Sequence, residues 1–196
     1  MHPNPVFRKA SHESTLKFAR ERGFGIFSVN GTDGPIAAHI PFTVSPDDTY
    51  IEAHVVRSNP IARALATPQP ALLAISGPDG YISPDWYGVE HQVPTWNYLA
   101  VDIRGELHLS PETDLRGVLD RLSSEFETRL APKPVWLTDK VPTDVLDKML
   151  RMIVPVRLEI TSIDSTRKLA QNKPDAARLG AADGLATSQI GSELST

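Results

Sequence analysis

The chain has 196 residues, of which 40% are hydrophobic and 22% charged, and its formal net charge at pH 7 is -4. This length suits one domain with a small appendage, and the apolar content is sufficient for a packed core, which excludes global disorder. The acidic balance gives no general attraction to nucleic acid or to an anionic membrane. The chain has no cysteine, which excludes disulfides, thiol catalysis and cysteine-ligated metal sites.

The first residues, MHPNPVFRKASHES, contain no apolar run that would indicate a secretory signal. No stretch of the sequence approaches the roughly 20 apolar residues that a membrane helix needs. We therefore expect a cytoplasmic protein without a membrane-spanning segment.

The first half of the chain is predicted to hold short strands joined by tight turns. Ser11 and Gly23 are suited to cap and stop a helix over 11–22. The cluster from Asn30 to Gly34, which contains an Asn-Gly pair, and the cluster from Ser45 to Asp48 indicate turns between strands. The short strands that they join make an antiparallel meander. Strands are expected at Phe24–Val29, Pro35–Phe42, Thr49–Val56 and Ala71–Ser76, with a short helix at Asn59–Ala66 and a turn at Gly77–Gly80.

The second half adds two longer helices between two alternating strands. The strands are expected at Tyr98–Leu109, with Gly105 at a bulge or bend, and at Val156–Ile163. The helices are expected at about 110–130 and 143–153. Strands without long intervening helices argue for an antiparallel barrel with helices outside it, of mainly β or α+β class, and against a doubly wound parallel sheet.

Two histidines are expected on neighbouring strands, His39 in PIAAHIPF and His54 in TYIEAHVV. Glu52 lies two residues before His54 and therefore faces the same side of its strand. The chain has no HxxxH or HExxH spacing, so we predict no metal site and favour hydrogen-bonded strand histidines.

The segment HVVRSNP, which begins at His54, has two interpretations. Arg57, the Ser58 hydroxyl and free helix-start amides would form a phosphate site. Alternatively, Asn59 is an ordinary N-cap and Arg57 lies in solvent. The residues alone favour neither interpretation.

Aromatic side chains gather in YISPDWYGVEHQVPTWNY, from Tyr81 to Tyr98. Such rings suit a flat polar ligand or a subunit interface, but they also suit a loop fixed to a core. Trp96 and Asn97 are candidates to stack on or hydrogen-bond a planar heterocycle. A second polar cluster, KLAQNKP, contains Lys168 and Gln171; the alternative for it is a solvated loop.

Together these segments resemble the PaiB-type family of FMN-binding negative transcriptional regulators. The likeness covers nearly the whole chain, and the ISPDWY and PTWNY blocks are specific in combination. The matching segments are HIPF at 39–42, HVVRSNP at 54–60, GPDGYISPDWY at 77–87, VPTWNYLAVDIRGE at 93–106 and KLAQNKP at 168–174.

The resemblance implies a split β-barrel like that of the pyridoxamine-phosphate-oxidase-like flavoproteins, in a homodimer that binds FMN at the subunit interface. It implies a barrel domain over 1–174 and gives no role to the tail over 175–196, which we expect to be a weak helix or flexible. The implied contacts to the FMN phosphate and ribityl chain are His39, the backbone of Ala38 and Ile40, and His54, Arg57, Ser58 and Asn59. The implied contacts to the flavin ring and its surroundings are Trp96, Asn97, Lys168 and Gln171.

Three functional hypotheses follow. The first is a dimeric FMN-binding protein with a regulatory role. The acidic charge and the lack of a helix-turn-helix pattern argue against direct DNA contact. The second is a flavin-dependent oxidoreductase, for which no residue is a clear catalytic acid or base, although His39, His54 and Tyr87 are candidates. The third and weakest is a haem-binding split barrel with a histidine as axial ligand.

Overall fold

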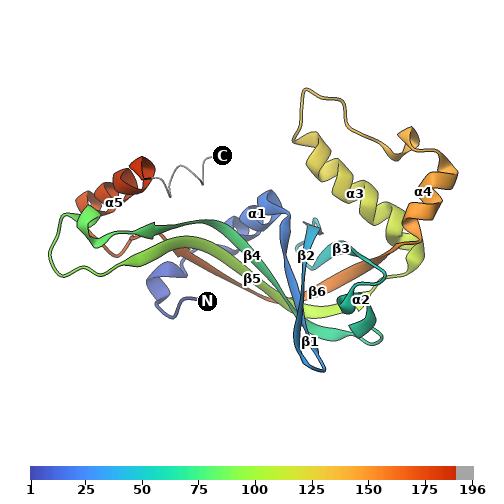
Figure 1. Ribbon diagram of the computed structural model, residues 1–196, viewed down its shortest axis with the longest axis horizontal. Helices are drawn as coiled ribbons and strands as arrows, with labels where there is room; N and C mark the ends of the chain where they lie inside the picture. The colour runs from blue at the N-terminus through green and yellow to red at the C-terminus, as the bar shows by residue number, and fades with distance from the viewer. Residues whose placement is uncertain (189–196) are drawn as a thin grey trace. The chain divides into compact units, whose positions relative to one another are not determined.

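The computed structural model describes residues 1–188 of the chain (Figure 1). Six strands hydrogen-bond in the closed order β1-β2-β3-β6-β5-β4. The strands are β1 (Phe24–Gly31), β2 (Gly34–Val44), β3 (Tyr50–Val56), β4 (Gln69–Ile82), β5 (Thr95–Leu109) and β6 (Ile153–Lys168). The helices are α1 (His12–Arg22), α2 (Pro60–Ala64), α3 (Leu115–Thr128), α4 (Thr143–Leu150) and α5 (Asp175–Thr187), with 3-10 turns η1 (Pro5–Phe7), η2 (Pro84–Tyr87), η3 (Glu112–Asp114) and η4 (Thr138–Lys140).

The chain divides into two compact units. Unit 1 comprises Met1–Thr15, Ser76–Val101 and the chain from Asp164 onward, and unit 2 comprises Leu16–Ile75 and Asp102–Ile163. The division falls inside β4, β5 and β6, so each of these strands contributes residues to both units.

Unit 2 contains the predicted antiparallel meander. β1 pairs with β2 from Phe24↔Pro41 to Gly31↔Gly34, which leaves a two-residue hairpin loop. β3 then pairs with β2 on one edge and with β6 on the other. Alternate residues of these strands are buried and form the core of the unit: Phe27, Val29, Ile40, Phe42, Ile51, Ala53, Val55, Val156 and Leu158.

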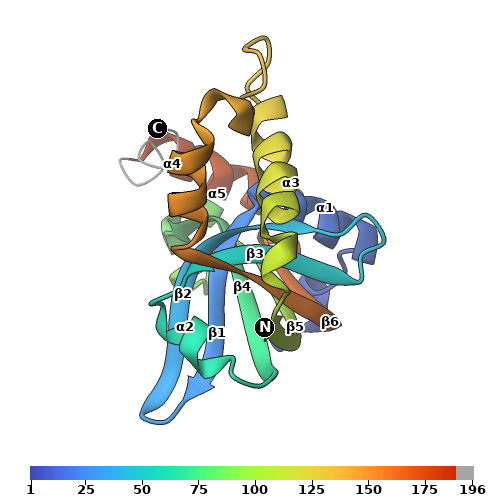
Figure 2. The ribbon, with the colours of Figure 1, turned by 90° about the vertical axis from the view of Figure 1, so that its right-hand side faces the viewer.

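Helix α3 packs against β2 and β3 in this unit (Figure 2). Its apolar stripe begins with Leu115, Val118 and Leu122, all buried as the helical spacing predicts. The helix expected at 143–153 ends earlier, at Leu150. Ile153 instead begins β6, because its backbone pairs with Val56 of β3.

Gly105 is required by a close backbone approach. β5 continues through this position as a strand, so the predicted bulge or bend does not interrupt it. A Cβ atom at residue 105 would lie 1.9 Å from the carbonyl oxygen of Glu159 on β6. Only glycine leaves space for that carbonyl.

Unit 1 has a small core of its own, in which α5 packs against η2. Ile82, Tyr87, Ala170, Ala177 and Ala181 are its buried members, and Trp86 and Leu185 pack against them. The Gly77–Gly80 segment, expected as a turn, lies inside β4.

The tail is helical over Asp175–Thr187. Glycines at 180 and 184 let this helix approach Trp86, because a Cβ atom at 184 would lie 2.4 Å from the Trp86 ring. The rest of the tail prediction, for residues 189–196, lies outside the described residues. No helix within the described chain is long and apolar enough to cross a membrane.

Candidate functional site

One edge of β2 is free of a neighbouring strand over part of its length. Pairing with β1 extends along β2 from Gly34 to Pro41. Pairing with β3 begins only at Phe42↔Ala53 and runs toward Val44. Within residues 1–188, the segment of β2 before Phe42 therefore has a strand on its β1 side only.

The pairing pattern identifies which main-chain groups lie on this free edge. The Phe42 N–H donates to the Gly23 carbonyl at 2.9 Å, so Phe42 directs its main-chain groups toward β1. In an antiparallel ladder the N–H and C=O of one residue point to the same edge, and successive residues alternate. Ala38 and Ile40 therefore bond to β1, whereas Ala37 and His39 direct their N–H and C=O groups to the free edge.

The prolines of β2 agree with this assignment. Pro35 and Pro41 occupy odd-numbered positions, as Ala37 and His39 do. Proline has no N–H and is tolerated where the ladder needs no donor. The main-chain groups of Ala38 and Ile40, which the resemblance implies as FMN contacts, therefore lie in the ladder with β1, and those of Ala37 and His39 lie on the free edge.

The side chains of His39 and His54 project from the outer face of the barrel wall. Their strand neighbours Ile40, Ala53 and Val55 are buried on the inner face. His39 is exposed and stacks beside Phe24, with ring centroids 6.5 Å apart and planes at 28°. His54 is half-buried, and burial lowers the pKa of its imidazole. Its Nδ1 has no hydrogen-bond partner among the described residues.

The Arg57 side chain is already occupied within the chain. Its guanidinium donates to Glu112 Oε1 at 2.9 Å and to the Arg151 carbonyl at 3.1 Å. Asn59 Oδ1 accepts from the Ile61 N–H at 2.9 Å and caps α2. These contacts agree with the interpretation in which Asn59 is an ordinary N-cap. They differ from it in one respect, because Arg57 forms an ion pair instead of lying free in solvent. Ser58 is exposed beside them.

The other predicted residues lie in unit 1. Lys168 Nζ donates to the Trp96 carbonyl at 2.8 Å and also contacts Thr95 Oγ1. Burial and the nearby charge of Lys173 lower the pKa of Lys168. The Trp96 ring is 52% exposed and lies edge-on to Tyr81, with centroids 6.1 Å apart.

Gln171 stabilises its own loop. Its Oε1 accepts from the Leu169 N–H at 2.7 Å, and its amide nitrogen contacts the Arg167 carbonyl. Asn97 differs, because its Oδ1 is buried and has no hydrogen-bond partner within residues 1–188. Of the four residues predicted in this unit, Asn97 and Lys168 line the same cavity.

Tyr87, a candidate acid or base in the sequence, and Lys173, an alternative phosphate contact beside Lys168, also line that cavity. The Tyr87 ring is 3% exposed, its hydroxyl has no partner, and burial raises its pKa. Lys173 Nζ lies 4.3 Å from the centroid of that ring. Both belong to the segments DWY and NKP that the sequence already marks, but only the fold brings them together.

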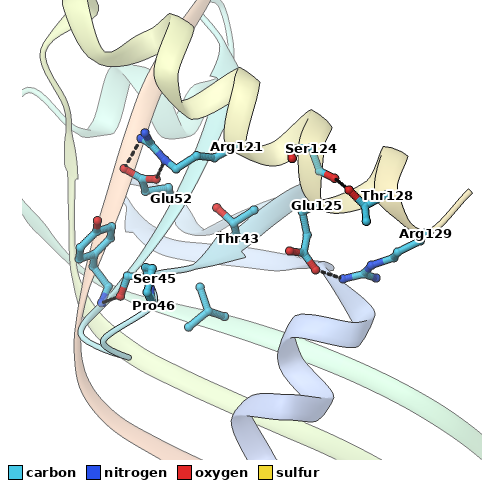
Figure 3. A pocket seen from close by; sticks show the side chains of 11 residues that line it. Thr43, Ser45, Pro46, Glu52, Arg121, Ser124, Glu125, Thr128 and Arg129 are labelled. Atoms are coloured by element: carbon cyan, nitrogen blue, oxygen red, sulfur yellow. Dashed lines mark hydrogen bonds and ion pairs between the residues drawn. The ribbon is translucent and has the colours of Figure 1, made fainter. Parts of the chain in front are cut away.

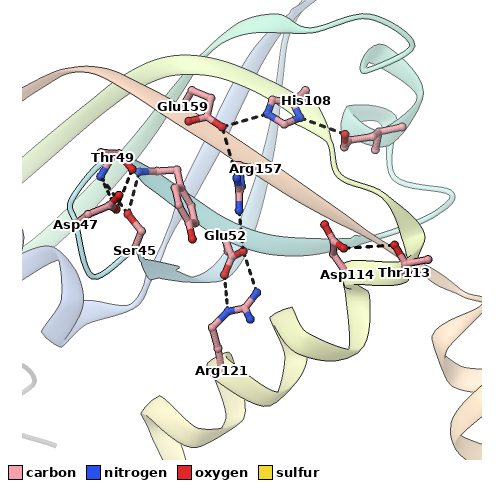
Figure 4. A network of polar contacts seen from close by, with 12 residues as sticks. Ser45, Asp47, Thr49, Glu52, His108, Thr113, Asp114, Arg121, Arg157 and Glu159 are labelled. Carbon is pink, nitrogen blue, oxygen red and sulfur yellow. Dashed lines mark hydrogen bonds and ion pairs between the residues drawn. The ribbon is translucent and has the colours of Figure 1, made fainter.

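A larger cavity in unit 2 is lined by α3 and the strands beneath it (Figure 3). Glu52 lies at its wall, buried to 7% exposure, and accepts two bonds from Arg121 at 2.7 and 2.9 Å. This pairing raises the pKa of Arg121. Arg157 reaches the same carboxylate at 3.4 Å and connects it to Glu159 (Figure 4). The carboxylate is saturated by arginines, so we interpret this network as structural.

Among residues 1–188, no group of three histidine, aspartate or glutamate side chains could hold a metal ion. Glu52 faces the same side of β3 as His54, as predicted, but its carboxylate is bound by Arg121.

The closed order of six strands with helices outside it is the fold of the split-barrel flavoproteins. Residues 1–162 match the family model described as "Putative FMN-binding domain", and the chain belongs to this family. It is 31% identical over 169 residues to "Protease synthase and sporulation protein PAI 2" of Bacillus subtilis, covering 85% of this chain and 80% of that protein. The PaiB-type resemblance and FMN as cofactor are thereby confirmed.

Solved structures confirm the fold class. The chain is similar to the FAD and haem binding protein from Mycobacterium smegmatis, with a TM-score of 0.62, 20% identity and coverage of 91% of this chain and 80% of that one. It is also similar to the flavocytochrome Anf3 from Azotobacter vinelandii, with a TM-score of 0.57, 14% identity and coverage of 85% and 72%. At these identities the likeness concerns the fold alone.

Proposed function

We propose that the protein binds FMN in a homodimer, with the pyrimidine edge of the flavin against the free edge of β2. The supporting observation is that Ala37 and His39 direct main-chain groups to an edge that no described strand occupies. A flavin presents a ring N–H between two carbonyl oxygens along its pyrimidine edge. A strand edge offers donors and acceptors in the same alternation.

Aromatic surface supports the dimer part of the proposal. Phe24, beside His39 in unit 2, is 48% exposed, and Trp96 in unit 1 is 52% exposed. Large exposed rings are enriched where subunits or flat ligands pack. A second subunit that covered Phe24 would also shield a flavin at the neighbouring edge of β2 from water. Sedimentation equilibrium tests this directly, and a monomer at micromolar concentration with FMN bound would reject the shared interface.

The main-chain contact is tested by removing a single N–H. In Ala37→Pro the N–H on the free edge is lost, whereas the bonds to β1 remain. Proline already occupies positions 35 and 41 with the same orientation. The loss of one neutral hydrogen bond should weaken FMN binding by about 0.5–1.5 kcal/mol, or roughly two- to tenfold. Ala37→Val keeps the N–H and serves as the matched control.

Fluorescence titration with FMN measures this difference, and unfolding curves check that both variants are folded. His39→Pro is the second variant, because the flavin would contact one or both of these amides. Wild-type FMN affinity in both proline variants would reject the β2 edge as the flavin contact.

Arg57 is the predicted phosphate contact, but the structure gives it an internal carboxylate partner. Its ion pair with Glu112 is exposed, with side chains 48% and 70% accessible. Such surface pairs contribute about 0–1 kcal/mol, so a phosphate would compete with Glu112 at small cost. Arg57→Ala should weaken FMN binding if this exchange occurs. An unchanged FMN affinity in Arg57→Ala would mean that another cationic group binds the phosphate.

A regulatory role is the family's expectation, and we propose that it works without direct DNA contact. The net charge of -4 opposes association with phosphate backbones. Fluorescence anisotropy with labelled duplexes at physiological salt tests this. Saturable, sequence-dependent binding to the duplexes would overturn the proposal that regulation works without direct DNA contact.

Flavin-dependent oxidoreduction is the second candidate function, and His54 is the observation that favours it. Burial lowers the pKa of its imidazole, which favours the neutral form. Its Nδ1 has no hydrogen-bond partner within residues 1–188, as a proton acceptor requires. FMN would supply the hydride chemistry. Anaerobic mixing with NADH and NADPH tests this function. A flavin band that neither nucleotide bleaches would argue for the binding role alone.

A further inference from the structure

A small cavity in unit 1 combines two cationic side chains with two buried polar groups that lack partners. Its volume is about 200 Å³. Lys168 and Lys173 supply the ammonium groups, and Tyr87 and Asn97 supply the unpartnered atoms. We propose that this cavity binds a phosphate group.

Charge is the first argument for an anionic ligand. No aspartate or glutamate of the described part of the chain lines the cavity. Within residues 1–188, the contacts of the two ammonium groups are to neutral acceptors: Lys168 bonds Thr95 and the Trp96 carbonyl, and Lys173 bonds the Gln92 side-chain oxygen. Two like charges around one cavity repel each other, and a dianion between them would compensate both.

The free donors of the site are the second argument. An ammonium group has three N–H bonds. Lys168 uses two of them on oxygen acceptors, which leaves one. Lys173 uses one on Gln92 and lies over the Tyr87 ring. Several charged donors therefore remain for oxygen atoms of a ligand.

The unpartnered groups are the third argument, because burial without a hydrogen bond is costly. The Tyr87 hydroxyl is a donor on a residue that is only 3% exposed. Leaving such a group unsatisfied costs about 1–3 kcal/mol. Among the described residues, Asn97 Oδ1 also has no hydrogen-bond partner. Rotation of the side-chain amide by 180° would place its N–H₂ group at the position of this oxygen. Both groups could then donate to one tetrahedral oxyanion.

The size of the cavity limits the ligand to a head group. Pockets that enclose a whole cofactor usually measure about 300–1,000 Å³, and this one is smaller. The phosphate therefore belongs either to FMN, whose remainder would lie outside the cavity, or to a separate phosphorylated compound. The first source rests on the proposed flavin function, and the second is independent of it.

The test uses flavin-free, full-length protein and inorganic phosphate as the probe, with binding followed by isothermal titration calorimetry at low ionic strength. We expect saturable binding that Lys173→Gln weakens about tenfold or more, because a charge-assisted contact is lost. Tyr87→Phe keeps the ring but removes the hydroxyl, and should weaken binding severalfold. Lys17→Gln is the matched control, since Lys17 is 76% exposed on α1, and it should bind phosphate as the wild type does.

Titration with FMN and with riboflavin, which lacks the phosphate, identifies the source. If Lys173→Gln weakens FMN but not riboflavin binding, the cavity holds the phosphate of FMN. If it weakens inorganic phosphate binding and leaves both flavins unchanged, the ligand is a separate phosphorylated compound. Riboflavin binding by the wild type tests the proposed flavin site without the phosphate. A failure of the proposed flavin site can therefore be distinguished from a failure of the phosphate cavity. The proposal is overturned if folded wild-type protein binds no phosphate and folded Lys173→Gln and Tyr87→Phe bind FMN with wild-type affinity.

Discussion

Removing Arg121 should destabilise unit 2 more than neutralising the carboxylate that it binds. Glu52 on β3 has a side chain only 8% exposed, whereas the Arg121 side chain on α3 is 54% exposed. In Arg121→Met the buried carboxylate keeps only the 3.4 Å contact from Arg157. In Glu52→Gln the amide carbonyl still accepts a bond, and the arginines can turn to water.

The magnitude follows from this asymmetry. Removing one partner of a fully buried ion pair costs about 3–5 kcal/mol, because an uncompensated charge remains. Arg121 is half exposed and Arg157 remains nearby, so we expect a loss of about 2 kcal/mol for Arg121→Met. Glu52→Gln leaves no buried charge and should cost about 1 kcal/mol.

Urea unfolding of the two single variants and the double variant measures these losses. Coincident fluorescence and circular dichroism transitions would support the two-state treatment. The double variant should be more stable than the sum of the single losses predicts, because removing the carboxylate removes the penalty. Equal losses, or a larger loss for Glu52→Gln, would refute the interpretation of Glu52 as a buried charge held by arginines.

Two further predictions concern strand packing and pH. Gly105→Ala should lower the free energy of unfolding in urea by at least about 2 kcal/mol, because its Cβ would meet the Glu159 carbonyl. Gly117→Ala in α3 is the control: its Cβ meets only the movable end of a side chain, so it should be neutral or stabilising by up to about 1 kcal/mol. Similar losses of stability in the two variants would refute the close approach at Gly105. The pKa of His54 is lowered in the folded state, so its contribution to the free energy of unfolding is complete above the ordinary value of 6.5 and is lost as the pH falls through the folded pKa. His54→Gln should therefore reduce the loss of unfolding free energy as the pH falls below about 6.5. His91→Asn, at a side chain 94% exposed, is the control and should not. An unchanged dependence of stability on pH in His54→Gln would contradict the lowered pKa of His54.

Local sequence signals were sufficient to predict the meander and most helices. The turn clusters at 30–34 and 45–48 and the alternating apolar residues predicted β1, β2 and β3, with the first turn formed by residues 32 and 33. The same reasoning was wrong at Gly77–Gly80, which lies inside β4, because pairing within a sheet can override the local turn preference of glycine and proline. It also extended α4 to residue 153, where pairing with β3 instead begins β6.

The site was less predictable, since it depends on contacts between residues distant in sequence. Nothing near Arg57 indicates that Glu112 pairs with it. The cavity of Tyr87, Lys168 and Lys173 joins two segments about 80 residues apart, whose proximity follows only from the fold. The orientation of β2 was not predicted either, since the sequence analysis named the backbone of Ala38 and Ile40, which bonds to β1. Pro35 and Pro41 mark the positions whose main chain faces away from β1, and this signal was not used.

The amide hydrogen exchange of β2 with and without FMN tests the central claim most directly. Ala38 and Ile40 donate to β1 and should exchange slowly in both states. The N–H groups of Ala37 and His39 point to the free edge and should exchange quickly in flavin-free protein. Saturating FMN should slow exchange at one or both of these amides while Ala38 and Ile40 stay unchanged. Fast exchange at both Ala37 and His39 in the FMN-saturated protein would contradict the assignment of the flavin to this edge.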